Sequence, residues 1–132
     1  MKYANNPLEV CALTLNQWIG TISKDGEVAI FDTLEHGIRA AAIILMRTYR
    51  KQRINTIREI IDQWAPAVDK PSMDFSAYVS KHANIPVRSV LRSRYVYAQV
   101  IYYMWAYIQQ EKPSLSMLEI LGIIQRNKIG LT

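Results

Sequence analysis

Residues 95–108, with the sequence YVYAQVIYYMWAYI, form a stretch that is apolar almost throughout and is interrupted only by Gln99. At 14 residues it is shorter than the roughly 20 apolar residues that a helix needs to cross a bilayer. A helix that is apolar on all its faces is instead buried inside a protein. We therefore expect residues 95–108 to lie in the central helix of a globular domain, and we expect no membrane span.

Toward the N-terminus, the segment WIGTISKDGEVAIF at residues 18–31 holds two β-prone runs around Asp25-Gly26. Asp-Gly supplies the positive φ angle of a tight hairpin turn, so the segment predicts one short β-hairpin. Asp32 follows, and Glu35 stands three residues later, a spacing typical of a capping box. Apolar residues at helical spacing predict that a helix runs from there to about Lys51.

Four more helices are expected, each indicated by a cap residue ahead of apolar residues at helical spacing. The first two begin at Thr56 and at Asp74, and they end before Pro66 and at His82. The last two begin at Ser89 or Ser93 and at Ser116, and they end near Glu111 and before the tail NKIGLT. No linker is long enough to separate two domains, and 132 residues suit one hydrophobic core. The expected fold is mostly α, a single domain over residues 1–132 with about five helices and one short β-hairpin near the N-terminus.

The 16 Lys and Arg residues outnumber the 11 Asp and Glu residues, which gives a formal charge of +5. A positive chain favours polyanionic partners such as nucleic acid, anionic lipid or wall polymers, and the charge alone does not choose among them. The N-terminal sequence lacks the pattern of a secretory signal. We therefore expect synthesis and retention in a cytoplasm, unless lysis or a virion delivers the protein elsewhere.

Motifs of known catalytic and metal centres are missing from the sequence. Cys11 is the single cysteine, so an internal disulfide is excluded, and we expect a buried, unreactive thiol. His36 and His82 do not have the spacing of a zinc site, so neither a metal nor a cofactor is expected. The chain also lacks a Gly-x-Ser-x-Gly elbow, a phosphate-binding loop and a His-Glu-x-x-His pair.

Glycan cleavage stays open, because it requires a carboxylic acid that an apolar setting keeps protonated. Glu111 ends the most apolar helix and is the first candidate, with a solvated helix end as the alternative. Glu35 is the second, with a capping role as the alternative. Trp18 and Trp64 lie near turns, where aromatic faces can stack on sugar rings, although core packing is the commoner use of such residues.

Two groups of basic residues are candidates for contact with phosphates. They are Arg47, Arg50, Lys51 and Arg53 in the first group, and Arg88, Arg92 and Arg94 in the second. No recognition helix or base-stacking motif accompanies them, so solvated helix faces are the alternative explanation. The sequence does not place the two groups on one face.

Several short motifs follow one another along the chain. They are Asn6-Pro7, WIG at 18–20, FDTLEHGIRA at 31–40, Thr48-Tyr49, NTI at 55–57, WAP at 64–66 and Tyr78-Val79. Together they resemble a family of small phage and prophage virion proteins, often described as structural proteins. That family is itself similar to lysozyme-like murein glucosaminidases and transglycosylases. The resemblance covers nearly the whole chain and implies a reduced lysozyme-like helical domain.

The chain departs from this family in three places. NPLEVC at 6–11 replaces the family's Asn-Pro-Gly-Asn-Ile-Arg, so a glycine turn and an arginine near the expected groove are missing. AVDKPSMD at 67–74 replaces a short acidic and polar stretch. Lysozyme-like enzymes carry their catalytic Glu on a helix before the Asn-Pro region, and the chain begins after that point. These departures are compatible with a divergent, inactive member.

The resemblance implies a virion- or lysis-associated domain that engages bacterial peptidoglycan or neighbouring virion proteins. If the protein cleaves glycan as a glycosidase or lytic transglycosylase, we expect Glu111 to be the general acid. Trp18, Trp64 and Tyr78 are then expected to line the groove. Two other functions stay open: a non-catalytic module that assembles with other proteins and, from charge alone, a nucleic-acid-binding protein.

Overall fold

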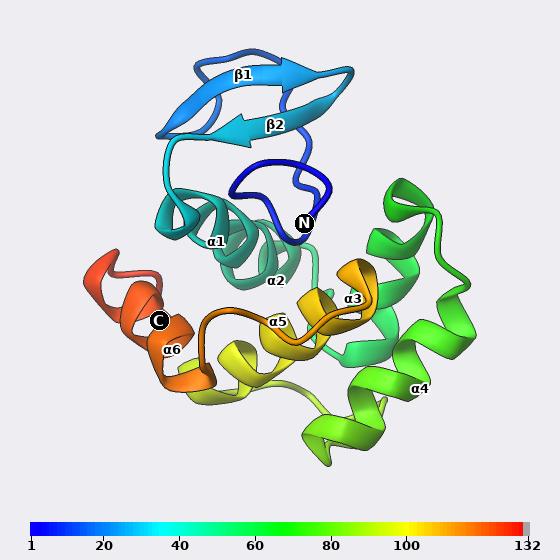
Figure 1. Ribbon diagram of the computed structural model, residues 1–132. Helices are drawn as coiled ribbons and strands as arrows, with labels where there is room; N and C mark the ends of the chain where they lie inside the picture. The colour runs from blue at the N-terminus through cyan, green and yellow to red at the C-terminus, as the bar shows by residue number, and fades with distance from the viewer. Residues whose placement is uncertain (131–132) are drawn as a thin grey trace.

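Helix α5 (Arg94–Gln109) lies at the centre of the computed structural model, which describes residues 1–130, and other helices surround it (Figure 1). Ser93 begins this helix, because its hydroxyl accepts a hydrogen bond from the Val96 N–H. Tyr97, Met104 and Trp105 are at most 1% exposed. The prediction of a central buried helix is therefore confirmed, and Ser93 rather than Ser89 is its cap.

The remaining helices follow the expected order. They are α1 (Leu34–Ile43), the π-helical turn η1 (Ile44–Thr48), α2 (Tyr49–Lys51), α3 (Ile57–Trp64), the 3₁₀ turn η2 (Ala65–Val68), α4 (Ser72–Ala83) and α6 (Met117–Arg126). α1, η1 and α2 form one unbroken helix that ends at Lys51, as predicted. α1, α4 and α6 all contact α5. The expectation of a mostly α fold with one short hairpin is confirmed.

Besides Ser93, two further predicted helix caps are present, at Thr56 and Ser116. The Thr56 hydroxyl accepts a hydrogen bond from the Glu59 N–H at 3.2 Å. Ser116 and Glu119 form a complete capping box, in which the Ser116 hydroxyl accepts from the Glu119 N–H and the Glu119 carboxylate accepts from the Ser116 N–H. Each cap satisfies a backbone donor that a helix start would otherwise leave without a partner.

The predicted capping box of the first helix, Asp32 with Glu35, is wrong. Thr33 is the cap, and its side chain accepts from the His36 N–H at 3.2 Å. Asp32 contacts the His36 ring instead, with Oδ1 2.7 Å from Nδ1. Glu35 pairs with Arg126 of α6 at 2.7 Å. The helix begins at Leu34, and Thr33 just before it has the extended backbone of a cap residue, with φ −135° and ψ 154°.

Two smaller predictions also need correction. α4 begins at Ser72, so Asp74 lies in its first turn rather than at its cap. Cys11 is exposed rather than buried. Val10 and Ala12 on either side of it are buried, and alternate residues of an extended segment point in opposite directions, so Cys11 faces outward.

The hairpin consists of β1 (Thr21–Asp25) and β2 (Val28–Phe31), which pair antiparallel. Gly26 has a φ of +61° at the turn between them, as the Asp-Gly pair predicted. The N-terminal segment, residues 1–12, runs along β2: the Ala29 N–H donates to the Val10 carbonyl at 3.0 Å. The segment and the hairpin lie together on one side of the helices (Figure 1).

The Asn6 side chain fastens the N-terminal segment to the hairpin. It is fully buried, and its Nδ2 donates to the Val10 carbonyl at 3.0 Å and to the Ala29 carbonyl at 2.7 Å. Its Oδ1 accepts from the Val10 N–H at 2.8 Å. The same segment lies tightly on α1, because a Cβ at Gly37 would stand 1.8 Å from the Asn5 carbonyl oxygen. A side chain at position 37 would therefore displace the segment.

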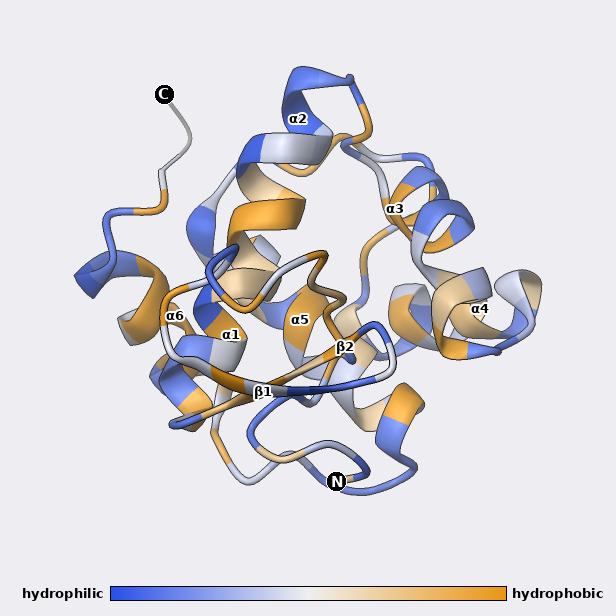
Figure 2. Cartoon of the chain, turned by 90° about the horizontal axis from the view of Figure 1, so that it is seen from above, coloured by the Kyte–Doolittle hydropathy of each residue, from blue (hydrophilic) through white to orange (hydrophobic). Residues whose placement is uncertain are grey.

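Buried residues of the helices, the hairpin and the N-terminal segment belong to one hydrophobic cluster. In Figure 2, α2 and the C-terminal end of α6 are hydrophilic, whereas much of α5 is hydrophobic. Among residues 1–130, no helix has the length and hydropathy of a membrane-spanning segment.

Replacing Asn6 with alanine tests how much the N-terminal segment depends on this side chain. We expect Asn6→Ala to lower the free energy of unfolding by about 3 kcal/mol, because three buried hydrogen bonds of about 1 kcal/mol each are lost. Urea denaturation measures the change. The control is Asn16→Ala, since Asn16 is exposed, and we expect a change of less than about 0.5 kcal/mol there. Equal effects of the two substitutions would contradict the assigned role of Asn6.

Candidate functional site

A cleft of about 270 Å³ opens between the N-terminal segment, the helix formed by α1, η1 and α2, and the end of α3. We call it the tryptophan cleft. Its lining residues are Glu9, Val10, Cys11, Gln17, Trp18, Ile44, Thr48, Tyr49, Gln63, Trp64 and Ala67. Two of the three residues predicted to line a glycan groove, Trp18 and Trp64, therefore meet in one place.

Backbone carbonyls of the N-terminal segment hold both indole rings. Trp18 Nε1 donates to the Cys11 carbonyl at 3.0 Å, and Trp64 Nε1 donates to the Leu8 carbonyl at 3.0 Å. Trp64 is only 6% exposed and packs edge-on against Tyr49, with ring centroids 6.1 Å apart. Trp18 is half-buried and is the more accessible of the two tryptophans. The cleft thus combines one accessible indole with a rigid aromatic wall.

Glu9 supplies the carboxyl group of this cleft. Burial raises the pKa of Glu9, and the charges of Lys2 and Lys70 and a hydrogen bond from Gln109 offset only part of that rise. The Gln109 Nε2 atom lies 3.4 Å from Glu9 Oε2. Glu9 also has a φ of +57°, a conformation uncommon for a residue with a side chain. A carboxyl group in this setting takes up a proton more readily than an exposed one does.

Glu9 is the charged residue of this cleft, and we did not predict it from the sequence. It stands between Leu8 and Val10, two apolar residues that are both buried. An acidic residue inside a short apolar run is the sequence signal that could have indicated it. The sequence could not show that residues 8–11 would meet Trp64, because that contact joins positions 56 residues apart.

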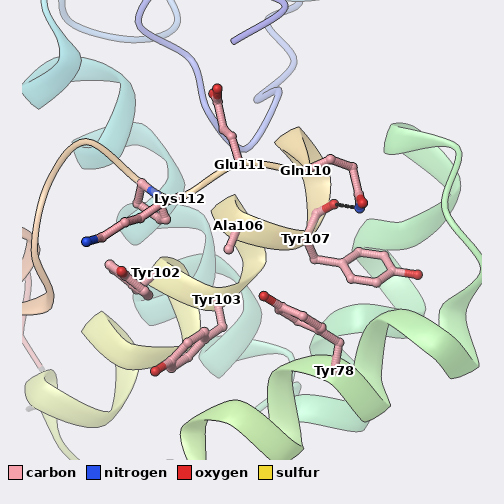
Figure 3. Close-up of a pocket in the computed structure, with 9 residues that line it drawn as sticks. Tyr78, Tyr102, Tyr103, Ala106, Tyr107, Gln110, Glu111 and Lys112 are labelled. Carbon is pink, nitrogen blue, oxygen red and sulfur yellow. Dashed lines mark hydrogen bonds between the residues drawn. The ribbon is translucent and has the colours of Figure 1, made fainter.

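Tyr78 and Glu111 line a different cavity, of about 420 Å³, with Tyr102, Tyr103 and Tyr107 (Figure 3). We call it the tyrosine groove. The Tyr78 and Tyr107 ring centroids are 5.2 Å apart. The Glu111 side chain points away from the tyrosine rings in Figure 3, and its carboxylate lies 3.2 Å from the N-terminal ammonium of Met1. Glu111 is 47% exposed, so it lacks the apolar enclosure that we expected around a general acid.

The surroundings of Glu35 favour its ionised form, whereas a general acid must hold its proton. A hydrogen bond from Arg126 lowers the pKa of Glu35, and Asn127 donates a second hydrogen bond at 3.3 Å. Both partners favour the ionised carboxylate. The role that the structure gives Glu35 is to join α1 to α6.

Members of both basic groups meet in a third cavity, of about 590 Å³. We call it the basic cleft, and its lining residues are Met46, Arg47, Arg50, Lys51, Asn55, Arg94, Lys128 and Gly130. The Leu91 N–H donates to the Asn55 carbonyl at 2.8 Å and so brings the two parts of the chain together. Arg53, Arg88 and Arg92 are exposed outside this lining.

Within residues 1–130, no group of three or more His, Cys, Asp or Glu side chains is arranged to hold a metal ion. Among the residues that line the tryptophan cleft, Glu9 is the one carboxyl group in the described part of the chain. Aromatic walls beside amide and hydroxyl groups suit the binding of a neutral, hydroxyl-rich ligand.

Comparison of the sequence with protein-family models and with curated proteins gives no match.

The raised pKa of Glu9 has a consequence for stability. Since the folded state holds this proton more tightly than the unfolded state, the contribution of Glu9 to stability falls as pH rises from the ordinary Glu pKa of about 4.3 through the folded-state pKa. Glu9→Gln removes that loss. We therefore expect the variant to gain stability relative to the native protein between pH 4 and pH 7, measured by urea denaturation at both pH values. A relative gain by the native protein over that range would contradict the burial of Glu9.

Proposed function

We propose that the protein binds the glycan strands of bacterial peptidoglycan in the tryptophan cleft and does not cleave them. It would serve as a wall-engaging domain of the phage or prophage virion proteins that its motifs resemble. The observation that carries this proposal is the convergence of Trp18, Trp64 and Glu9 on one cleft. These three residues come from separate parts of the chain, and a cleft with aromatic walls and a few polar groups is typical of a ligand site.

Sugar recognition would use the two kinds of surface that the cleft offers. The apolar C–H face of a pyranose ring packs on an aromatic face, and Trp18 is placed for this contact because its Nε1 hydrogen bond fixes the ring. The amides of Gln17 and Gln63 and the hydroxyl of Thr48 line the same cleft. They can donate and accept hydrogen bonds with sugar hydroxyls and acetamido groups.

Glu9 would act as a hydrogen-bonding group toward the glycan. A protonated carboxyl donates one hydrogen bond and still accepts others, whereas an ionised carboxyl only accepts. Because burial raises the pKa of Glu9, it can donate over a wider pH range than an exposed glutamate. The two carboxyl groups predicted as general acids do not contribute here, since Glu111 lies at the tyrosine groove and Glu35 is paired with Arg126.

Co-sedimentation with purified insoluble peptidoglycan tests this function. We expect the protein to bind, and we expect Trp18→Ala to weaken binding about tenfold, because the stacking surface is lost. Tyr95→Ala is the matched control: Tyr95 is 43% exposed but does not line the tryptophan cleft, so binding should stay unchanged. The supernatant of the same samples should contain no soluble glycan fragments.

Two results would overturn the proposal in different ways. Release of soluble fragments that Glu9→Gln abolishes would show a glycosidase or transglycosylase rather than a binding domain. No sedimentation with the wall would leave assembly with neighbouring virion proteins as the function. The exposed apolar side chains of Leu13, Ile19 and Ile22, beside and within the hairpin, would then be the surface to test.

A further inference from the structure

The basic cleft gathers five cationic side chains from three separate parts of the chain. Arg47 lies in η1, Arg50 and Lys51 in α2, Arg94 at the start of α5, and Lys128 after α6. Among residues 1–130, none of the five forms an ion pair, and no acidic or aromatic side chain lines the cleft. Like charges held together without counter-charges repel one another, so the arrangement is unfavourable by itself.

Favourable interactions with helix dipoles explain the positions of only some of these cations. Arg50 and Lys51 lie in the last turn of their helix, where the dipole favours a cation. Arg94 is the first residue of α5, where the dipole is positive, and no acidic residue stands in that turn. The cation at position 94 therefore adds to the positive potential of the helix start. That combination suits a bound anion.

Two of the arginines are held in position by the chain that follows α6. Arg47 Nη2 donates to the Lys128 carbonyl at 3.2 Å, and Arg94 Nε donates to the Ile129 carbonyl at 3.0 Å. Each of these bonds uses one of the five N–H donors of a guanidinium group. The remaining donors can contact a ligand without a further loss of side-chain freedom, which is how arginine binds phosphate well.

We propose that the basic cleft binds an oligophosphate group, that is, two or three directly linked phosphates. The five cationic side chains surround one cleft of about 590 Å³, whereas the charges of five phosphodiesters, at about 3.4 Å each along a duplex strand, are spread over about 14 Å. A triphosphate places about four negative charges on three adjacent phosphates. Compact, highly charged phosphate thus matches the five cations better than a phosphodiester polymer does.

The lining also indicates that the cleft recognises phosphate alone. Bases of nucleotides and nucleic acids are usually bound by stacking on aromatic side chains, and among residues 1–130 the cleft has none. Free oligophosphate and a nucleoside triphosphate should therefore bind with similar affinity. This site is separate from the tryptophan cleft, so Trp18→Ala should leave oligophosphate binding unchanged.

Isothermal titration calorimetry at low salt, with sodium tripolyphosphate as the probe, tests this site. We expect tripolyphosphate to bind more tightly than pyrophosphate, pyrophosphate more tightly than orthophosphate, and adenosine triphosphate as tightly as tripolyphosphate. Lys51→Gln and Arg94→Gln should each weaken tripolyphosphate binding about tenfold, because each removes a charged donor. Arg92→Gln is the control, since Arg92 is an exposed arginine two residues away that does not line the cleft.

Several outcomes would overturn the proposal. One is the absence of tripolyphosphate binding at low salt. Another is binding that Lys51→Gln leaves intact; Lys51 is exposed and forms no side-chain hydrogen bond in the described part of the chain, so this variant should fold normally. A third is tighter binding of oligothymidylate than of tripolyphosphate, with a loss in Arg92→Gln as large as in Arg94→Gln. That result would indicate an extended nucleic-acid surface.

Discussion

The buried carboxamide of Asn6 is the contact on which the rest of the arrangement depends. The N-terminal segment has no helix or long strand of its own, so its path is set by the three hydrogen bonds of Asn6 and by its close approach to Gly37 on α1. That path brings the Leu8 carbonyl to the Trp64 indole and places Glu9 beside it. The tryptophan cleft is therefore a consequence of how the segment is held, because one of its walls is that segment.

Two surfaces of different chemistry follow from the packing around α5. The tryptophan cleft is aromatic, and its carboxyl group has a raised pKa, so neutral polyhydroxylated ligands suit it. The basic cleft lies where α2, the start of α5 and the chain after α6 meet, and its charges suit compact anions. Glu35 connects α1 to α6 through Arg126 and so supports the position of the chain that lines the basic cleft. The two sites share one core but no lining residue, so each can be altered without changing the other.

Local chemistry made much of the fold predictable from the sequence. Thr56, Ser93 and Ser116 are caps because their hydroxyls satisfy backbone donors a few residues away, and Gly26 turns the hairpin for a reason equally local. Other predictions failed because the partners are distant in sequence. Asp32 and Glu35 fit the pattern of a capping box, but Arg126 binds Glu35 across 91 positions. Glu9 and the grouping of Arg47 with Arg94 likewise depend on long-range packing, which spacing along the chain does not reveal.

Glycan binding in the tryptophan cleft is tested by an NMR titration that follows the three indole N–H resonances while soluble peptidoglycan fragments are added. Trp105 is 1% exposed in the core and serves as the internal reference. If the tryptophan cleft binds glycan, the Trp18 and Trp64 signals should shift with a common saturation curve, and the Trp105 signal should stay in place. Saturable binding that leaves the Trp18 and Trp64 signals unmoved, with the shifted resonances confined to the tyrosine groove or the basic cleft, would contradict glycan binding in the tryptophan cleft.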